Sequence, residues 1–173
     1  RIPPTFDDEK VLQAGLCVSG QTIGAALKRV RHLVEGVNIT RSVIVNIGSV
    51  DIMQGKPLVQ IEHDFRELIN VMHRNGLTPI LTTLAPLANY SHVAHVKDRL
   101  ERFNEFIKRV GKYLIRYLQV IFPNYHRAAR NVTGAQYPHV FWNKIGRQRV
   151  LQLIESKRIL DKIFWFCQKH CNV

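Results

Sequence analysis

The chain has 173 residues, of which 46% are hydrophobic and 22% are charged. These values lie in the ordinary range of a globular domain and exclude a fibrous repeat, a coiled coil and an intrinsically disordered chain. Lys and Arg number 25 against 13 Asp and Glu, which gives a net charge of +12 and a pI near 10.1. Such an excess favours an anionic partner, nucleic acid or a phospholipid surface, over neutral or cationic ligands.

Strands and helices are expected to alternate along the first half of the chain. A strand is predicted over residues 10–18, and Ser19-Gly20 then opens a helix with an apolar face. The β-branched runs at residues 42–47 and 78–84 are typical of buried strands. The segment between these runs has apolar residues at helical spacing and ends at Asn75-Gly76, which supplies a stop signal. This pattern predicts a strand, helix, strand unit.

The second half continues the alternation. The periodicity predicts an amphipathic helix over residues 96–114, a strand over residues 118–122 that Pro123 halts, and a helix over about residues 143–168. Alternation of this kind predicts a single α/β domain, residues 1–173, built as a three-layer α/β/α sandwich with a mainly parallel sheet. Ligands of such folds bind beyond the carboxyl ends of the strands.

Cysteine usage and hydropathy bear on the compartment. No apolar stretch approaches the ~18 residues of a membrane span, so no membrane partner is expected. Cys17, Cys167 and Cys171 are odd in number and lack framework spacing, which favours the reducing cytoplasm. His92 and His95 have metal-like spacing, but no companions at the spacing of a structural zinc site. No metal and no cofactor is therefore expected.

The positive charge is concentrated in the second half of the chain. Residues 1–95 carry nine Lys or Arg and eight Asp or Glu, whereas residues 96–173 carry sixteen and five. Between Glu105 and Glu155 there is no acidic side chain, although nine basic ones occur there. A solvated surface ordinarily mixes both signs and so limits self-repulsion. The missing acids indicate a surface whose counter-charges come from a ligand.

Aromatic and basic side chains are interleaved after residue 124, as in proteins that bind RNA. Lys and Arg neutralise phosphates, and exposed rings stack on unpaired bases. The candidate RNA-binding residues are Tyr125, His126, Arg127, Arg130, Lys144, Arg147 and Arg149. A second basic cluster contains Lys28, Arg29, Arg31, His32 and Arg41. This second cluster either widens the same surface, with Arg29 and Arg31 as contacts, or is an ordinary solvated face.

Four segments follow one another in an informative order: CVSGQTIG, NIGSVDIMQG, PILTTLAPL and YPHVFWNKIG. Together they resemble segments of the SGNH (GDSL-type) esterase and lipase family over roughly residues 11–154. The resemblance implies a flavodoxin-like α/β/α fold. In that family a Ser in a Gly-Asp-Ser turn is the nucleophile, a Gly and an Asn complete the oxyanion hole, and an Asp-x-x-His pair supplies the oriented general base.

This chain departs from the family pattern at three of five roles. Gly20 matches the family's glycine and His139 its histidine. Val50 stands where the oxyanion Asn belongs, and Gln136 stands where the orienting Asp belongs. No Gly-Asp-Ser triplet occurs anywhere, and the ten residues before Val11 contain no serine. The resemblance therefore implies a hydrolase scaffold without its catalytic residues, not an enzyme.

Among noncatalytic scaffolds of this kind, CVSGQTIG, NIGSVDIMQG and YPHVFWNKIG together with the basic second half resemble the OSK domain of insect germ-plasm organisers. That resemblance implies binding to untranslated regions of maternal mRNA in cytoplasmic ribonucleoprotein granules of the germ plasm, with other germ-plasm proteins as further partners. Two alternatives stay open. One is a residual esterase or acetyl-hydrolase that uses His139 as its base, and the other is a protein-interaction module.

Overall fold

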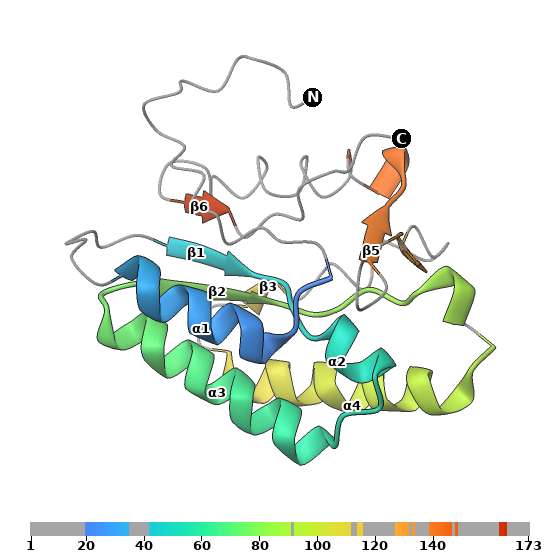
Figure 1. Cartoon of the computed structure of the whole chain (residues 1–173), viewed down its shortest axis with the longest axis horizontal. Coiled ribbons are helices and arrows are strands. Elements are labelled where there is room, and N and C mark those ends of the chain that lie inside the picture. The colour runs from blue at the N-terminus through green and yellow to red at the C-terminus, as the bar shows by residue number, and fades with distance from the viewer. Residues whose placement is uncertain are drawn as a thin grey trace.

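The computed structural model describes residues 20–34, 42–90, 92–111, 114–115, 127–131, 133, 139–146, 148 and 163–165. The helices are α1 (Ile23–Val34), α2 (Ser49–Met53), α3 (Leu58–Arg74) and α4 (Ala94–Val110), with a 3-10 turn η1 at Ala88–Tyr90. The strands are β1 (Ser42–Val45), β2 (Thr78–Thr82), β3 (Leu114–Ile115), β4 (Arg127–Arg130), β5 (His139–Trp142) and β6 (Ile163–Trp165). Figure 1 shows their arrangement.

The main sheet is parallel and has the strand order β3-β2-β1-β6. In β1, Ile44 lies opposite Ile80 of β2 on one side and Trp165 of β6 on the other. Strands β4 and β5 form a separate antiparallel pair. The prediction of an α/β fold with a mainly parallel sheet is confirmed, because helices alternate with the parallel strands β1, β2 and β3.

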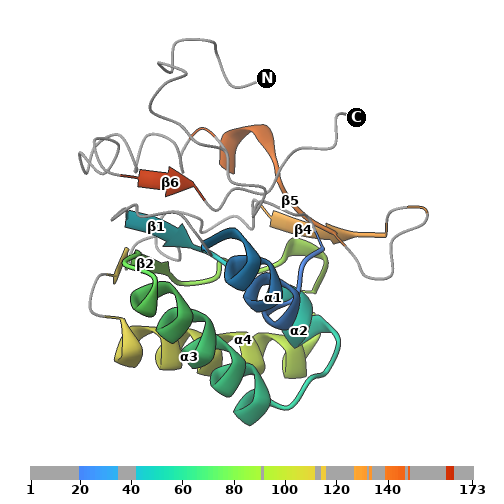
Figure 2. The ribbon, with the colours of Figure 1, turned by 60° about the vertical axis from the view of Figure 1, so that its left-hand side comes forward.

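Both faces of β1 are buried, as a layered fold requires. Val43 and Val45 lie on one face and join a core with α1, α3 and α4, which pack on the same side of the sheet (Figure 2). Ile44 lies on the opposite face because side chains alternate along a strand, and it is only 5% exposed. A continuous apolar run such as residues 42–45 is the pattern expected of a strand covered on both sides.

Three phenylalanines form the centre of the helix-covered core. Phe65 of α3 meets Phe103 and Phe106 of α4 edge-on, with ring centroids 5.4 and 6.0 Å apart. The rings of Phe103 and Phe106 are stacked, with centroids 5.7 Å apart. All three side chains are almost fully buried. Aromatic pairs in these geometries contribute about 0.5 to 1.5 kcal/mol each beyond the area they bury, so this cluster fixes α3 against α4.

Local signals specified α3 well. Pro57 is its N-cap, and its apolar stripe of Ile61, Phe65, Leu68 and Met72 is buried. The helix ends at Arg74, and Gly76 adopts a left-handed φ of 72°. The amide of Leu77 then donates to the Met72 carbonyl at 2.9 Å, which closes the helix end. The predicted stop at Asn75-Gly76 is confirmed, because glycine takes a positive φ without steric cost.

Two predicted helices are too long. The helix expected over residues 96–114 ends at Val110, since Gly111 is extended, and Leu114 pairs with Leu81 as part of β3. Within the range expected to be helical at residues 143–168, Ile163–Trp165 is strand β6, in register with β1. Short apolar runs satisfy helical and strand periodicity equally, so the pairing with a distant strand decides between them.

The start of the second of these helices agrees with the prediction. Helical residues begin at Lys144, and the Asn143 side-chain oxygen accepts the Gly146 amide hydrogen at 2.8 Å. This is the bond that an asparagine N-cap makes. The strands predicted at residues 10–18 and 118–122 lie outside the described residues.

Candidate nucleic-acid interface

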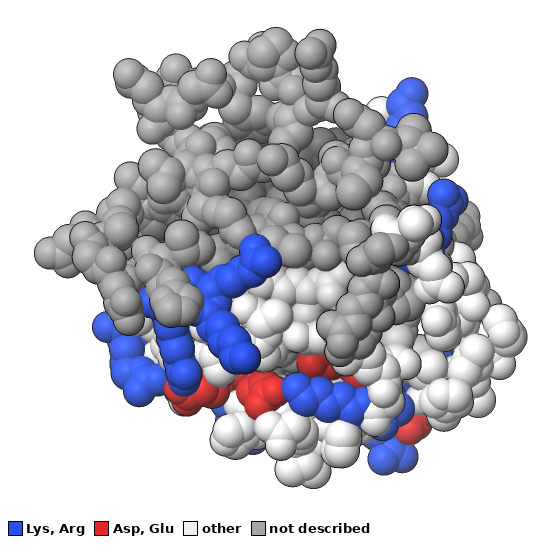
Figure 3. All heavy atoms as spheres, in the orientation of Figure 1, with Lys and Arg blue, Asp and Glu red and all other residues white. Residues whose placement is uncertain are grey.

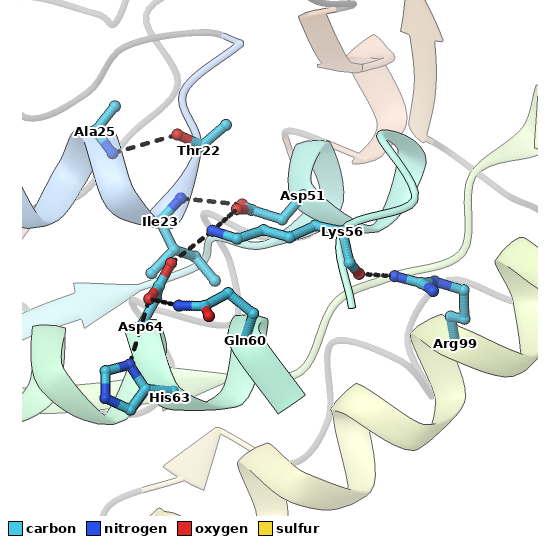
Figure 4. A network of polar contacts seen from close by, with 9 residues as sticks. All are labelled: Thr22, Ile23, Ala25, Asp51, Lys56, Gln60, His63, Asp64 and Arg99. Carbon is cyan, nitrogen blue, oxygen red and sulfur yellow. Dashed lines mark hydrogen bonds and ion pairs between the residues drawn. The ribbon is translucent and has the colours of Figure 1, made fainter. Parts of the chain in front are cut away.

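A buried aspartate joins the start of α1 to the carboxyl end of β1. Asp51, in α2, is completely buried, and its Oδ2 accepts the Ile23 amide hydrogen at 2.9 Å (Figure 4). Its Oδ1 lies 3.4 Å from the ammonium group of Lys56. The Ile23 amide is one of the donors that the first turn of a helix leaves unpaired. Asp51 thus holds the Gly20 and Val50 segments together, as expected for segments at the same sheet edge.

Lys56 connects this aspartate to a second one on α3. Its ammonium lies 2.5 Å from Asp64, which also accepts a hydrogen bond from the Gln60 amide at 2.7 Å. Arg99 of α4 donates to the backbone carbonyl of Lys56. The group Asp51, Lys56 and Asp64 therefore ties α1, α2 and α3 together, and Arg99 extends the connection to α4 (Figure 4).

Burial and pairing pull the pKa values of this group in different directions. Burial raises the pKa of Asp51 above its usual value, although the Ile23 amide and Lys56 oppose the shift. Burial would lower the pKa of Lys56, but the hydrogen bond to Asp64 and the two carboxylate charges outweigh it and raise that pKa. For Asp64 burial raises the pKa, and the hydrogen bonds from Lys56, Gln60 and His63 more than reverse this, so its pKa is lowered. These opposed shifts match a structural ion-pair network.

Three of the positions predicted to correspond to SGNH catalytic groups, Gly20, Val50 and His139, lie on elements near the carboxyl end of the sheet. Gly20 has a left-handed φ of 75° and precedes α1. Val50 is buried in α2 and presents no polar side-chain atom. His139 is the first residue of β5, and β5 packs against α2. Gln136 lies outside the described residues, as does the side chain of His139. The isopropyl side chain of Val50 cannot donate a hydrogen bond to an oxyanion at this edge.

Strands β4 and β5 form an antiparallel ribbon with one exposed cationic side chain near each end, Arg130 at the end of β4 and Lys144 just after β5. In this ribbon Arg130 lies opposite His139, and Arg127 lies opposite Trp142. Val140 is buried against Leu87, which fastens the ribbon beside α2 and η1. Positions 127 and 130 fall on opposite faces because strand residues alternate. The predicted RNA-binding residues of β4 therefore do not form one row.

We call the described residues 127–131, 133 and 139–146 the ribbon region. They include Arg and Lys but no Asp or Glu. Arg130, at the end of β4, and Lys144, just after β5, are both exposed. Within the described part of the chain, neither makes an ion pair. Asn131 and Thr133, which follow Arg130, are also exposed. The ribbon and the turn after it therefore present uncompensated positive charge to solvent.

The second basic cluster is partly neutralised. Lys28, Arg29 and Arg31 are exposed on α1, but Arg31 pairs with Glu67 of α3 at 3.0 Å. Arg74 pairs with the same Glu67 oxygen at 2.9 Å. The hydrogen bond from Arg31, followed by that from Arg74, lowers the pKa of Glu67. Figure 3 shows the resulting mixture of blue and red over α1 and α3 at the left, and other blue side chains at the upper right.

The remaining predicted contacts lie outside the described residues: Tyr125, His126, Arg147 and Arg149, together with the side chain of Arg127. Sequence reasoning did not single out Asp51, Lys56 or Asp64. One signal was present, since Asp51 lies between the apolar residues Val50 and Ile52 in the segment that follows a predicted buried strand, where an acid needs a partner. Among the described residues, no group of three histidine, cysteine or carboxylate side chains could hold a metal ion.

Comparison with known proteins places this chain in a family. A family model of the OSK domain matches residues 3–159. The chain belongs to the OSK domain family. It is 53% identical over 162 residues to the maternal effect protein oskar of Drosophila virilis and 55% identical over 160 residues to that of Drosophila melanogaster. Each match covers 86% of this chain and 26% of the relative, so the chain corresponds to about a quarter of those proteins.

Solved structures agree with this assignment. The OSK domain of Drosophila Oskar matches with a TM-score of 0.72 at 49% identity, over 87% of this chain and 76% of that one. A GDSL-like lipase from Bacteroides thetaiotaomicron matches at 0.56 and 19% identity, over 82% and 72% of the two chains. The esterase EstA from Pseudoalteromonas matches at 0.55 and 18% identity, over 83% and 75%. The predicted SGNH-like α/β fold and the resemblance to the OSK domain are confirmed.

Within the described part of the chain, no helix combines the length and the apolar character that crossing a bilayer demands.

Proposed function

We propose that this OSK domain is a noncatalytic RNA-binding domain on an inactive SGNH hydrolase scaffold. It binds untranslated regions of maternal mRNA in cytoplasmic granules of the germ plasm, and other germ-plasm proteins are further partners of the whole protein. The observation that carries the proposal is the uncompensated charge of the ribbon region, where Arg130 and Lys144 are exposed. The similarity to maternal effect proteins supports a maternal role.

The chemistry of this surface suits a polyanion. Exposed guanidinium and ammonium groups displace the counterions condensed on a nucleic acid, and this release supplies most of the sequence-independent affinity. RNA-binding surfaces add rings on which unpaired bases stack, at about 1 to 3 kcal/mol per base. Tyr125, shortly before β4, remains a predicted stacking side chain, and His126 remains a predicted RNA contact. Among the described residues of the ribbon and its flanks, no carboxylate is present to repel approaching phosphates.

A hydrolytic function is less well supported. An acyl transferase of this fold needs a nucleophile, an oriented base and an oxyanion hole. The chain has no Gly-Asp-Ser turn, buried Val50 replaces the oxyanion Asn, and Gln136 replaces the orienting Asp. The loss of one oxyanion donor alone costs about 2.7 to 4 kcal/mol of transition-state stabilisation.

Neutralising the ribbon should weaken RNA binding. With Arg130→Gln and Lys144→Gln combined, we expect the slope of log affinity against log salt for a single-stranded RNA to become shallower by about 1.4, since each lost phosphate contact contributes about 0.7. The measurement is fluorescence anisotropy at several salt concentrations. Lys97→Gln with Arg109→Gln, two exposed cations of α4, is the control with the same change in net charge. Equal effects of both pairs would remove the ribbon from the interface.

The residual-esterase alternative has its own test. We expect the native domain to hydrolyse an activated acetyl ester no faster than His139→Ala, because no carboxylate orients the imidazole and no nucleophilic Ser stands in the family position. Initial rates across pH 6 to 9, corrected for buffer hydrolysis, make the comparison. A rate that depends on His139 and saturates with substrate would favour the esterase.

A further inference from the structure

The turn that follows β4 contains an exposed hydroxyl group beside the basic end of the strand. Thr133 is exposed, and the described serine and threonine side chains elsewhere, Thr22, Ser49, Thr78, Thr82 and Thr83, are buried or half-buried. Thr133 also differs from them in its neighbour three residues upstream. That neighbour is Arg130, itself exposed, whereas none of the others has a basic residue at this spacing. Among the described serine and threonine residues, Thr133 thus combines an exposed side chain with a basic residue three positions before it.

We propose that Thr133 is a phosphorylation site for a basophilic serine/threonine protein kinase, and that its phosphorylation switches off RNA binding at the ribbon. The effect on RNA binding rests on the proposed function, whereas the assignment of Thr133 as a phosphate acceptor does not. Kinases discriminate among substrates by charge patterns around the acceptor. Here Arg130 lies three residues before the hydroxyl and Arg127 six before, and no acidic side chain occurs between Glu105 and Glu155.

The position in the fold suits the reaction. A kinase binds its acceptor in an exposed segment, and β4 is extended up to Arg130, with exposed Asn131 and Thr133 after it. Figure 2 shows β4 leading towards the outer edge of the molecule, away from the main sheet. The γ-phosphoryl group of Mg-ATP passes to Thr133 Oγ1. A P–O bond forms to the hydroxyl oxygen as the bond to the β-phosphate oxygen breaks, ADP leaves, and the hydroxyl proton goes to the kinase.

The product acts on the same charges that RNA uses. Phosphothreonine carries about −1.5 to −2 charges and three strong acceptor oxygens. Placed three residues after Arg130, it can accept charge-assisted hydrogen bonds from that guanidinium, which RNA phosphates would otherwise use. It also repels approaching phosphates. Both effects lower affinity without any change of fold.

The acceptor is tested directly with the folded chain. We expect the catalytic subunit of cAMP-dependent protein kinase, a basophilic enzyme, to add phosphate from Mg-ATP at Thr133, located by mass spectrometry of peptides. Arg130→Ala should slow the reaction on the order of tenfold, since the recognising charge is lost, whereas Arg109→Ala on α4 should not. Buried Thr82 and Thr83 serve as internal controls for unfolding. Phosphate found elsewhere but not at Thr133 would overturn the site.

The switch is tested by RNA binding before and after phosphorylation. The phosphorylated domain should bind a single-stranded RNA of about 20 nucleotides on the order of tenfold more weakly, with a shallower salt dependence. Thr133→Val should bind like the native domain and should not respond to the kinase. Unchanged affinity of a fully phosphorylated sample would refute the switch. If the unmodified domain binds no RNA, the proposed function and the switch both fail, while the peptide mapping still decides whether Thr133 is an acceptor.

Discussion

Replacing Lys56 with methionine should destabilise the domain by about 3 to 5 kcal/mol at neutral pH. The variant keeps the volume of the side chain but removes the ammonium group from the completely buried carboxylate of Asp51, which still accepts the Ile23 amide hydrogen. Removal of one partner from a buried ion pair has a cost of this size because the other charge stays desolvated. Urea unfolding followed by far-UV circular dichroism measures the difference.

The pH dependence identifies the group responsible. Burial already raises the pKa of Asp51 in the native domain, and loss of Lys56 should raise it further. A folded state that binds a proton more tightly than the unfolded state gains stability as pH falls, so the deficit of the variant should shrink between about pH 7 and 5. Asp51→Asn combined with Lys56→Met should recover most of the loss. Lys97→Met, at an exposed position of α4, is the matched control, and a similar loss there would contradict the explanation.

Replacing Gly48 with alanine should cost about 3 to 5 kcal/mol. Gly48 has a φ of 121°, and a Cβ atom there would lie 2.6 Å from Cε1 of Phe103. Phe103 cannot move aside easily, because it packs against Phe65 and Phe106 in the core. Backbone strain at an unfavourable φ and overpacking of a dense core each cost about 1 to 3 kcal/mol. Thermal and urea unfolding both report the change.

Gly55 provides the comparison that separates the two causes. It also has a positive φ, 73°, but a Cβ atom there would meet nothing within 4 Å. Gly55→Ala should therefore cost only about 1 to 2 kcal/mol, the strain of a left-handed residue alone. Phe103→Leu should relieve part of the loss in Gly48→Ala, so that the double substitution is less harmful than the sum. Equal losses at Gly48 and Gly55 would exclude the clash as a cause.

Local patterns predicted those elements whose signals lie within one segment. The helix α3 has an apolar stripe and a glycine after it, and its C-terminal end was predicted to within a residue or two. Strands β1 and β2 were recognisable as β-branched runs. The predicted C-terminal end of α4 and the helix predicted over Ile163–Trp165 were wrong, because the apolar side chains of Leu114 and of this segment fit the pattern of a helix as well as that of a strand. Only pairing with distant strands distinguishes the two states.

The candidate site divides in the same way. Order and spacing predicted Gly20, Val50 and His139 as family positions, and the structure brings the elements that carry them to the same edge of the sheet. The pairing of Arg31 with Glu67 was not predictable, since 36 residues separate them. The alternation of positions 127 and 130 likewise depends on β4 being a strand, which no local pattern had indicated.

The amino-acid sequence by itself determined the charge excess, the alternation of strands and helices, and the absence of the hydrolase serine triplet, because these are properties of composition and of short segments. The tertiary structure decided which cations stay uncompensated, which buried acid caps α1, and which strand lies beside β1. Each of those outcomes is a contact between residues far apart in the chain. Such contacts leave no periodic trace in the sequence, since they depend on how the apolar faces of separate elements pack together.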